Sequence, residues 1–264
     1  MKAYCINLDR RPDRLAHMTA EFARAGIPFE RIPAVDGQDP EVAATAARLP
    51  LSSLSNKRIS TGAYGCMQSH RAAWRQLIAS GDRWGMIFED DLVLAPDLAL
   101  HLHDGWVPKD ADIVKLETFR IRLHISREHQ DIGGGRRVAR LLSSHIGAGA
   151  YLTNAETAQL LLAETVVCGD PVDELMFNEQ LPFFSKVRIY QMFPAPAIQG
   201  DRAEVTKQKL HSGWQATSIV DRLASGHVET DITPETPLHR LWRRGREEIR
   251  ARVRGTRYVV VPHG

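Results

Sequence analysis

The stretch GMIFEDDLVL, residues 85–94, sets three consecutive carboxylates, Glu89, Asp90 and Asp91, inside an otherwise apolar run. The apolar residues before the acids predict a buried strand over 84–88. In open α/β sheets ligands bind at the carboxyl ends of strands, and the three acids fall at such an end. Buried carboxylates are costly unless a cation lies beside them. We therefore expect a metal ion here, or an arginine in the purely structural alternative.

The type of metal follows from the donor atoms. Carboxylate oxygens with no His or Cys close by in the sequence favour Mg²⁺ or Mn²⁺ over zinc. Side chains alternate along a strand, which would point Glu89 and Asp91 to one face and Asp90 to the other. We therefore predict Glu89 and Asp91 as the metal ligands. A metal held in this way usually carries a substrate diphosphate, which indicates nucleotide chemistry.

Strand and helix patterns alternate on both sides of this stretch. Apolar residues at helical spacing predict one helix that ends at Gly26 and others over 63–79 and 155–166. The pattern predicts an α/β fold, a single domain with a central, mostly parallel sheet flanked by helices. The glycine-rich stretch 131–137 predicts a hairpin turn and not a phosphate loop. Apolar segments bounded by turn residues predict further strands over 3–7, 29–35, 111–117, 147–154 and 186–193.

Length and composition are those of an ordinary globular protein. With 264 residues, 43% of them hydrophobic, the chain can bury a substantial core. Its three cysteines form no CxxC pair, which indicates a reducing compartment and argues against a disulfide framework. The apolar start is too short for a signal peptide, and no run approaches the ~18 apolar residues of a membrane span. We therefore expect a cytoplasmic protein.

The net charge of +2 hides a basic segment over 238–257, which carries eight arginines. Apolar residues including Trp242 recur between the arginines at roughly helical intervals. A basic amphipathic helix of this kind would bind an anionic membrane surface, on the inner face of the membrane. The alternatives are a solvated tail or one packed on the body. Nucleic acid is not an expected partner, because no basic face with interleaved aromatics is visible elsewhere. We place a catalytic domain at 1–200 and a C-terminal extension at 201–264.

Several segments together resemble glycosyltransferase family 25, which includes lipooligosaccharide and collagen β-galactosyltransferases. The resemblance implies a GT-A-like (Rossmann-like) fold, a UDP-sugar donor (commonly UDP-galactose), a divalent metal and inversion at the anomeric carbon. It spans roughly residues 2–200, and the segments stand in the family's order. They are YCINLDRRPDR (4–14), GAYGCMQSHRAAW (62–74), MIFEDDLVL (86–94), GAGAYLTNAETAQLLL (147–162) and PVDELMF (171–177).

The resemblance also implies which residues bind the donor. Three of these residues also have a structural alternative: Asn7 and Asp9 could cap the first helix, and His70 could be a hydrogen-bonded core histidine on an apolar helical face. Glu89 and Asp91 would hold the metal and the diphosphate. The donor-binding positions implied are Asn7, Asp9, Arg10, Arg14, Ser69, His70 and Asp90.

Inversion needs a base that takes the proton from the acceptor hydroxyl. The family position favours Asp173 in the segment CGDPVDELMF as this catalytic residue. Glu174 and Asp170 are rivals, and an acid that only stabilises a helix N-terminus is the structural alternative. His211 in KQKLHSGW could add a metal or phosphate contact.

The leading hypothesis is thus a metal-dependent glycosyltransferase that moves a hexose, galactose by the resemblance, to a lipooligosaccharide or other lipid-linked glycan. A nucleotidyltransferase or nucleotide hydrolase would use the same acids on Mg²⁺, but it should also show a phosphate-cradling loop. A non-enzymatic alternative is a metal-regulated module that docks on a membrane.

Overall fold

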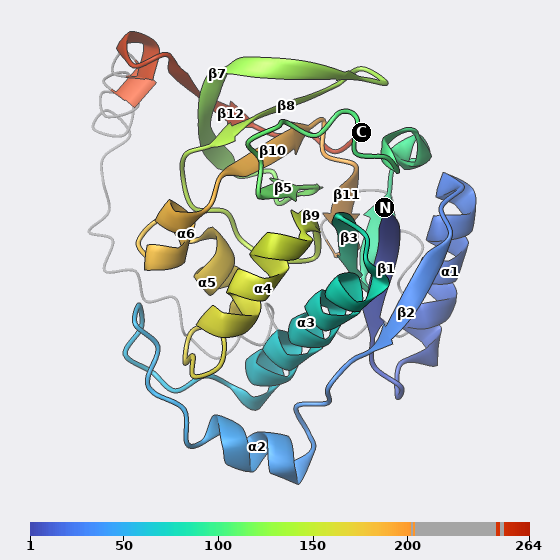
Figure 1. Ribbon diagram of the computed structural model, residues 1–264, viewed down its shortest axis with the longest axis vertical. Helices are drawn as coiled ribbons and strands as arrows, with labels where there is room; N and C mark the ends of the chain where they lie inside the picture. The colour runs from blue at the N-terminus through green and yellow to red at the C-terminus, as the bar shows by residue number, and fades with distance from the viewer. Residues whose placement is uncertain (202, 204–246, 249–250) are drawn as a thin grey trace.

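The computed structural model describes residues 1–201, 203, 247–248 and 251–264. A nine-stranded sheet in the order β12-β7-β8-β10-β5-β9-β3-β1-β2 runs through its centre (Figure 1). Its strands are β1 (Lys2–Asn7), β2 (Phe29–Pro33), β3 (Trp84–Glu89), β5 (Ile113–Lys115), β7 (Arg122–Gly133), β8 (Arg136–Leu141), β9 (Ala150–Asn154), β10 (Ile189–Phe193) and β12 (Thr256–Val260). A second sheet, in the order β4-β11-β6, consists of β4 (Leu92–Leu94), β6 (Glu117–Thr118) and β11 (Ala197–Gln199).

The expected α/β class is confirmed, but the large sheet is mixed and not mostly parallel. Among the described strands of this sheet, only the pairs β1–β2, β1–β3 and β5–β10 are parallel. Strand β9 lies antiparallel between β3 and β5, and β7 and β8 form the hairpin predicted around 131–137. Parallel neighbours need a crossover, usually a helix, whereas the chain between β5 and β9 contains none and reverses direction. Alternating strand and helix patterns could not show this reversal.

Helices cover both faces of the sheet. Alternating residues of β3 divide between two buried clusters: Ile87 packs with α3, whereas Met86 and Phe88 pack with α1. Figure 1 shows α3 and α4 together on one side of the sheet and α1 on the other. The helices are α1 (Pro12–Ala25), α2 (Pro40–Ala46), α3 (Thr61–Ser80), α4 (Ala155–Glu164), α5 (Val172–Phe177) and α6 (Pro182–Lys186), with a 3₁₀ turn at Leu98–His101.

The helix ends follow from the residues placed there. Gly26 after α1 and Gly81 after α3 both adopt a left-handed conformation, which glycine reaches without strain. Asn154 caps α4 by accepting a hydrogen bond from the Thr157 amide at 2.7 Å.

Helix α3 lies unusually close to the loop that follows β2. A Cβ atom on Gly65 would stand 2.7 Å from the carbonyl oxygen of Val35 and 2.9 Å from the amide nitrogen of Gly37. One turn further along, the Ser69 hydroxyl accepts a hydrogen bond from the Val35 amide at 2.8 Å. Gly65 and Ser69 of the GCMQSH segment therefore fix α3 against this loop.

This packing predicts a stability difference between two glycines of α3. Gly65→Ala should lower the free energy of unfolding by roughly 1–3 kcal/mol, because the added methyl meets backbone atoms that must move. Gly62→Ala is the matched control: a Cβ atom added there would have nothing within 4 Å, and alanine favours helix by about 0.5–1 kcal/mol. Urea unfolding of both variants tests this, and equal stabilities would contradict the close packing.

The C-terminal end of the chain returns to the main sheet. Strand β12 pairs antiparallel with β7, so residues 256–260 are an edge strand of that sheet. Arg122 at the start of β7 contacts Glu247 at 2.8 Å. Most of the predicted basic helix, 238–246 and 249–250, lies outside the described residues, and the domain boundary at 200 stays a prediction.

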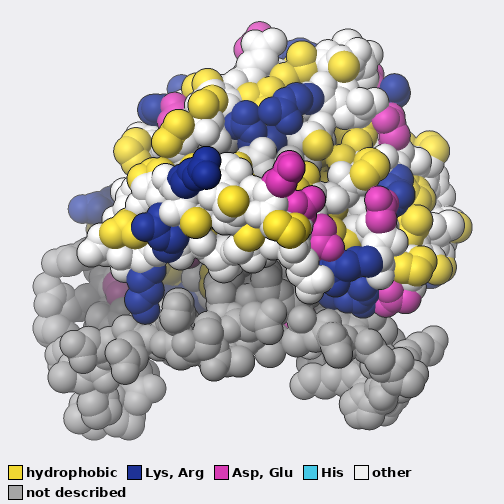
Figure 2. All heavy atoms as spheres, turned by 90° about the horizontal axis from the view of Figure 1, so that it is seen from below, with side chains coloured by type: hydrophobic (Ala, Val, Ile, Leu, Met, Phe, Trp, Pro, Cys, Tyr) yellow, Lys and Arg dark blue, Asp and Glu magenta, His cyan; other side chains and the backbone are white. Residues whose placement is uncertain are grey.

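Two features of the described residues concern the predicted partners: the apolar character of the helices and the distribution of charge on the surface. None of the described helices has the length and apolar character needed to cross a membrane. On the described part of the face in Figure 2, Lys and Arg side chains are interspersed with Asp and Glu and form no continuous basic stripe.

Candidate active site

The first strand and the acidic strand end side by side. Strands β1 and β3 are parallel, with Ile6 opposite Glu89, so the residues that follow each strand meet. The Asn7 amide donates to the Asp90 carboxylate at 2.7 Å, and the Arg14 guanidinium donates to the same carboxylate at 3.0 Å. The structure thus brings the opening NLDRRPDR segment to the EDD segment.

Other polar residues of the opening segment contact residues in β2 and in the loop that follows it. Arg31 donates to the Asn7 side-chain oxygen at 3.1 Å and also pairs with Asp9. Arg10 forms an exposed ion pair with Asp36 at 2.5 Å. Helix α1 begins without a side-chain cap, so neither Asn7 nor Asp9 has the capping role of the structural alternative. Donor contacts by these residues remain predictions.

The three acids do not follow strand alternation. Strand β3 ends at Glu89, and Asp90 and Asp91 form the turn that leads into β4. Arg14 lies 3.0 Å from Asp90 and 3.9 Å from Asp91, so both carboxylates share one guanidinium. The prediction that Glu89 and Asp91 face the same way assumed a strand, and the strand ends before Asp91. The arginine of the structural alternative does lie beside the acids.

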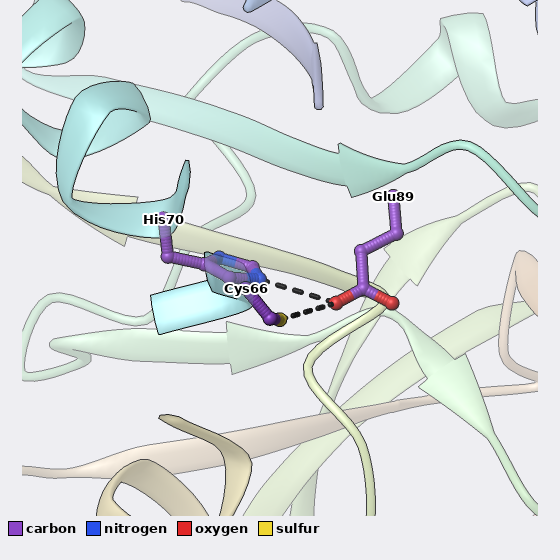
Figure 3. A group of neighbouring side chains, drawn as sticks. All are labelled: Cys66, His70 and Glu89. Atoms are coloured by element: carbon purple, nitrogen blue, oxygen red, sulfur yellow. Dashed lines mark hydrogen bonds and ion pairs between the residues drawn. The ribbon is translucent and has the colours of Figure 1, made fainter. Parts of the chain in front are cut away.

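Glu89 points toward α3, where two side chains hold it (Figure 3). His70 Nε2 lies 3.2 Å from Glu89 Oε1, and Cys66 Sγ lies 3.5 Å from the same oxygen. No His or Cys lies close to the acids in the sequence, but the fold brings both to Glu89 on α3, from about twenty residues earlier in the chain. Burial raises the pKa of Glu89, but the His70 hydrogen bond and further contacts outweigh it and leave the pKa lowered.

The tautomer of His70 follows from its partners. Trp74 Nε1 donates to the Tyr151 hydroxyl at 2.8 Å, and the same hydroxyl lies 2.8 Å from His70 Nδ1. Since indole nitrogen can only donate, the Tyr151 proton is available for Nδ1, and Nε2–H then donates to Glu89. His70 and Trp74 are fully buried, so this relay supports Glu89 from behind. A direct donor contact by Ser69 or His70 remains a prediction.

Asp91 has the most unusual environment of the three acids. Its side chain is buried, and its Oδ1 has no hydrogen-bond partner within the described part of the chain. Burial, followed by the nearby Glu89 carboxylate, raises the pKa of Asp91 well above its usual range, and Arg14 only partly offsets this. A carboxylate oxygen without a partner in such a place suits a cation.

A buried ion pair lies at the end of another strand. Lys115 is completely buried; its ammonium donates to Glu117 Oε1 at 2.5 Å and to the Gly147 carbonyl, and it lies 4.1 Å above the Phe177 ring. The Gly149 amide donates to Glu117 Oε1 at 2.8 Å. Burial lowers the pKa of Lys115 and raises that of Glu117, and each charge partly offsets the shift of the other.

The small sheet brings Glu117 to the acidic turn. Strand β11 lies between β4, which follows Asp91, and β6, which begins at Glu117. Like Asp91 Oδ1, Glu117 Oε2 is buried and has no hydrogen-bond partner among the residues described. Sequence reasoning missed Lys115 and Glu117. The available signal was the same as for the EDD segment: charged residues at the end of an apolar strand, in ADIVKLE.

Asp173 joins this cluster from α5. The Gly147 amide donates to Asp173 Oδ2 at 3.2 Å, and the carboxylate favours the charged form of Lys115. Asp173 is 6% exposed. The residue chosen as the base therefore lies in the same charge cluster as the EDD segment, although its role as a base remains a prediction.

The rival acids have structural contacts. Asp170 accepts hydrogen bonds from the Ser52 hydroxyl at 2.7 Å and the Ser53 amide at 2.8 Å, which fix the 50–58 loop to the start of α5. Glu174 accepts one from the Asn178 amide group at 2.7 Å. His211 lies outside the described residues.

The cluster carries an excess of negative charge. Five carboxylates interact through space with two cationic side chains, so these seven groups carry a net charge of −3 when all five carboxylates are ionised. Two carboxylate oxygens with no partner among described residues are hard donors, which fit Mg²⁺ or Mn²⁺. The members are Glu89, Asp90, Asp91, Glu117 and Asp173, with Arg14 and Lys115.

Residues 1–176, two thirds of the chain, match the model of glycosyltransferase family 25 (LPS biosynthesis protein). The chain belongs to glycosyltransferase family 25. It is therefore an enzyme that transfers a sugar, and its substrates are a nucleotide-sugar donor and a glycan acceptor. This sets aside the nucleotidyltransferase and the non-enzymatic membrane module. The matched range contains the predicted metal, donor-binding and base residues of this glycosyltransferase, from Asn7 to Asp173, and leaves out His211.

The glycosyltransferase is similar over most of its length to curated proteins. It is 28% identical to the lacto-N-neotetraose biosynthesis glycosyltransferase LgtB of Neisseria meningitidis, covering 98% of this chain and 99% of that protein. It is 26% identical to the lipooligosaccharide biosynthesis protein lic2B of Haemophilus influenzae, covering 79% and 80%. A solved glycosyltransferase involved in glycosylation of the PBCV-1 major capsid superposes with a TM-score of 0.40 at 8% identity, covering 80% of this chain and 98% of that one.

Proposed function

We propose that this family 25 enzyme transfers a hexose, with galactose the first choice, from a UDP-sugar to a hydroxyl of a lipooligosaccharide-type glycan. The reaction requires Mn²⁺ or Mg²⁺ and inverts the anomeric carbon. The observation that carries the metal requirement is the pair of buried carboxylate oxygens, Asp91 Oδ1 and Glu117 Oε2, that lack a partner among the described residues. The resemblance to β-galactosyltransferases supports the sugar, and the names of the relatives support the acceptor.

Charge explains why a metal is needed. The donor diphosphate is anionic, and so is the acidic cluster that it must approach. A divalent ion on Asp91 and Glu117 supplies charge neutralisation for the departing UDP when bound. Lys115 cannot serve the diphosphate directly, because it is fully buried and bound to Glu117. Its role is to hold the Glu117 carboxylate so that Oε2 remains available.

Other residues of the chain position the reacting groups. Asn7 and Arg14 fix Asp90 and thereby the turn that presents Asp91. Asp173, held by the Gly147 amide, takes the proton from the acceptor hydroxyl as the new glycosidic bond forms. The tail at 238–257 would hold the enzyme at the inner face of the membrane, although most of that segment lies outside the described residues.

The test is UDP release from UDP-galactose and UDP-glucose with Mn²⁺, Mg²⁺ or EDTA, combined with calorimetry of donor binding. Water replaces the missing acceptor, so slow turnover is expected. Release with one sugar that disappears in EDTA supports the proposal. If neither UDP-sugar binds with either metal, the proposed donor and metal are wrong.

Asp173→Asn should lower kcat by roughly 10²–10⁴-fold, because the amide cannot accept the acceptor proton. Donor affinity should stay within a few fold of the wild type, since Asp173 acts on the acceptor side. The matched control is Glu174→Gln, a change of the neighbouring acid that can keep its hydrogen bond with Asn178. Equal losses of kcat in both variants would remove Asp173 from the role of base.

A further inference from the structure

Three different donor atoms converge where α3 meets the end of β3 (Figure 3). Cys66 Sγ, His70 Nε2 and Glu89 Oε1 all lie within 4.8 Å of one another. We propose that they form a binding site for a thiophilic divalent ion, Zn²⁺, separate from the oxygen-ligand site at Asp91 and Glu117. This metal site is distinct from the contact with the sugar donor that the sequence predicted for His70.

The spacing of the donor atoms suits tetrahedral zinc. With Zn–S near 2.3 Å and Zn–N and Zn–O near 2.0 Å, neighbouring ligand atoms stand about 3.5 Å apart for S and O and about 3.3 Å for N and O. The observed separations are 3.5 Å for Cys66 Sγ to Glu89 Oε1 and 3.2 Å for His70 Nε2 to Glu89 Oε1. Two of the three separations therefore already match those of zinc ligands, and the third, between Cys66 Sγ and His70 Nε2, is within 4.8 Å.

The fold presents these ligands in advance. Cys66 and His70 are four residues apart, so they project from the same face of α3. Metal-bound histidines are usually oriented by a hydrogen bond at the second ring nitrogen, and the Tyr151 hydroxyl at 2.8 Å from His70 Nδ1 provides it. Trp74 fixes that hydroxyl in turn. Cys66 is half-buried and the Glu89 side chain is 25% exposed, which leaves access from solvent.

The donor set selects the ion. Thiolate and imidazole favour zinc, whereas Mg²⁺ prefers oxygen alone. On binding, the Cys66 thiol releases its proton to solvent. The neutral His70 ring changes tautomer: Nε2 loses its hydrogen and binds the ion, and Nδ1 carries the ring hydrogen and donates it to the Tyr151 oxygen. Three protein ligands leave the fourth position to water. Affinity should therefore rise with pH, because one proton is released per ion bound.

Zinc at this site would affect sugar transfer, a consequence that rests on the proposed function. Glu89 borders both sites, because its carboxylate also interacts with Asp91. Zinc bound to Glu89 would offset the negative charge of this carboxylate beside the catalytic metal. Micromolar zinc should therefore inhibit Mn²⁺-dependent UDP release, and Cys66→Ser should relieve the inhibition.

The direct test measures binding without catalysis. Metal-free full-length protein is titrated with Zn²⁺ by calorimetry and with Co²⁺ by absorbance, where a thiolate-to-cobalt charge-transfer band reports the Cys66 contact. Cys66→Ser and His70→Gln should each weaken zinc binding by at least about 10-fold, and Cys66→Ser should remove the band. Cys168→Ser is the control, because this cysteine lies in another part of the fold and should change neither result.

The zinc site is overturned if the wild type binds no stoichiometric zinc, or if Cys66→Ser binds it as tightly as the wild type. Thermal unfolding of each variant shows whether it is folded, and Asp91→Asn supplies a second, independent comparison. Asp91→Asn should retain zinc binding while it loses Mn²⁺-dependent UDP release. If the protein releases UDP with Mn²⁺ but binds no zinc, only the proposed zinc site is wrong. If it binds zinc but reacts with no UDP-sugar, only the proposed function is wrong.

Discussion

Asp91→Asn is expected to lower metal-dependent UDP release by about 10³-fold, the scale of losing a main electrostatic contact to a leaving group. The amide has nearly the same shape as the carboxylate but lacks the negative charge that binds the ion. Stability should not fall, because burial already disfavours the charged form of Asp91, as its raised pKa shows. The loss should therefore appear in catalysis and metal binding alone.

Two measurements separate this prediction from a folding defect. Mn²⁺ binding followed by electron paramagnetic resonance should weaken in Asp91→Asn, while the urea midpoint stays at or above the wild-type value. Asp131→Asn, in the exposed β7–β8 hairpin, is the matched control and should match the wild type in both. A variant that keeps Mn²⁺ affinity would show that Asp91 does not bind the metal, and the remaining acids would have to do so.

Lys115→Met is expected to lower the free energy of unfolding by roughly 3–5 kcal/mol, because it removes one partner of a fully buried ion pair. Among the residues that the structure describes, Glu117 then keeps one hydrogen bond, from the Gly149 amide, and has no cation in contact with it. The apolar stem of methionine fills most of the space, including the position above Phe177, so lost packing contributes little.

A double-mutant cycle isolates the charge effect. Adding Glu117→Gln to Lys115→Met should restore most of the stability, because no buried charge is left without its partner. Urea unfolding of the four proteins gives the coupling free energy. If the double variant is as unstable as the sum of the single variants, Lys115 contributes mainly by packing and does not orient Glu117.

How far the site could be predicted depends on how its residues are related in the chain. The meeting of Asn7 with Asp90 was predictable, because parallel strands end at the same edge of a sheet and both segments stood at predicted strand ends. The hairpin at 131–137 was predictable from its glycines. The orientation of Asp91 was not, because the strand rule stops at Glu89 and the turn that follows has no fixed periodicity.

Contacts between distant segments set the rest. Nothing in the local pattern of 62–74 shows that Cys66 and His70 face Glu89, since that contact depends on how α3 crosses the sheet. Nothing local pairs Lys115 with the Gly147 loop, or brings Glu117 to the acidic turn through β11. The antiparallel insertion of β9 between β3 and β5 likewise depends on a chain reversal that composition does not encode.

The sequence by itself determined the α/β class, the helices α1, α3 and α4, the acidic strand end and membership of glycosyltransferase family 25, because these rest on local periodicity and on motifs read in order. Only the tertiary structure decided which carboxylates lack a partner among the described residues, which are held by Lys115 or His70, and where sulfur and imidazole join them. The physical reason is that a charge acquires its properties from its neighbours in space, through burial and hydrogen bonds that no short window of sequence contains.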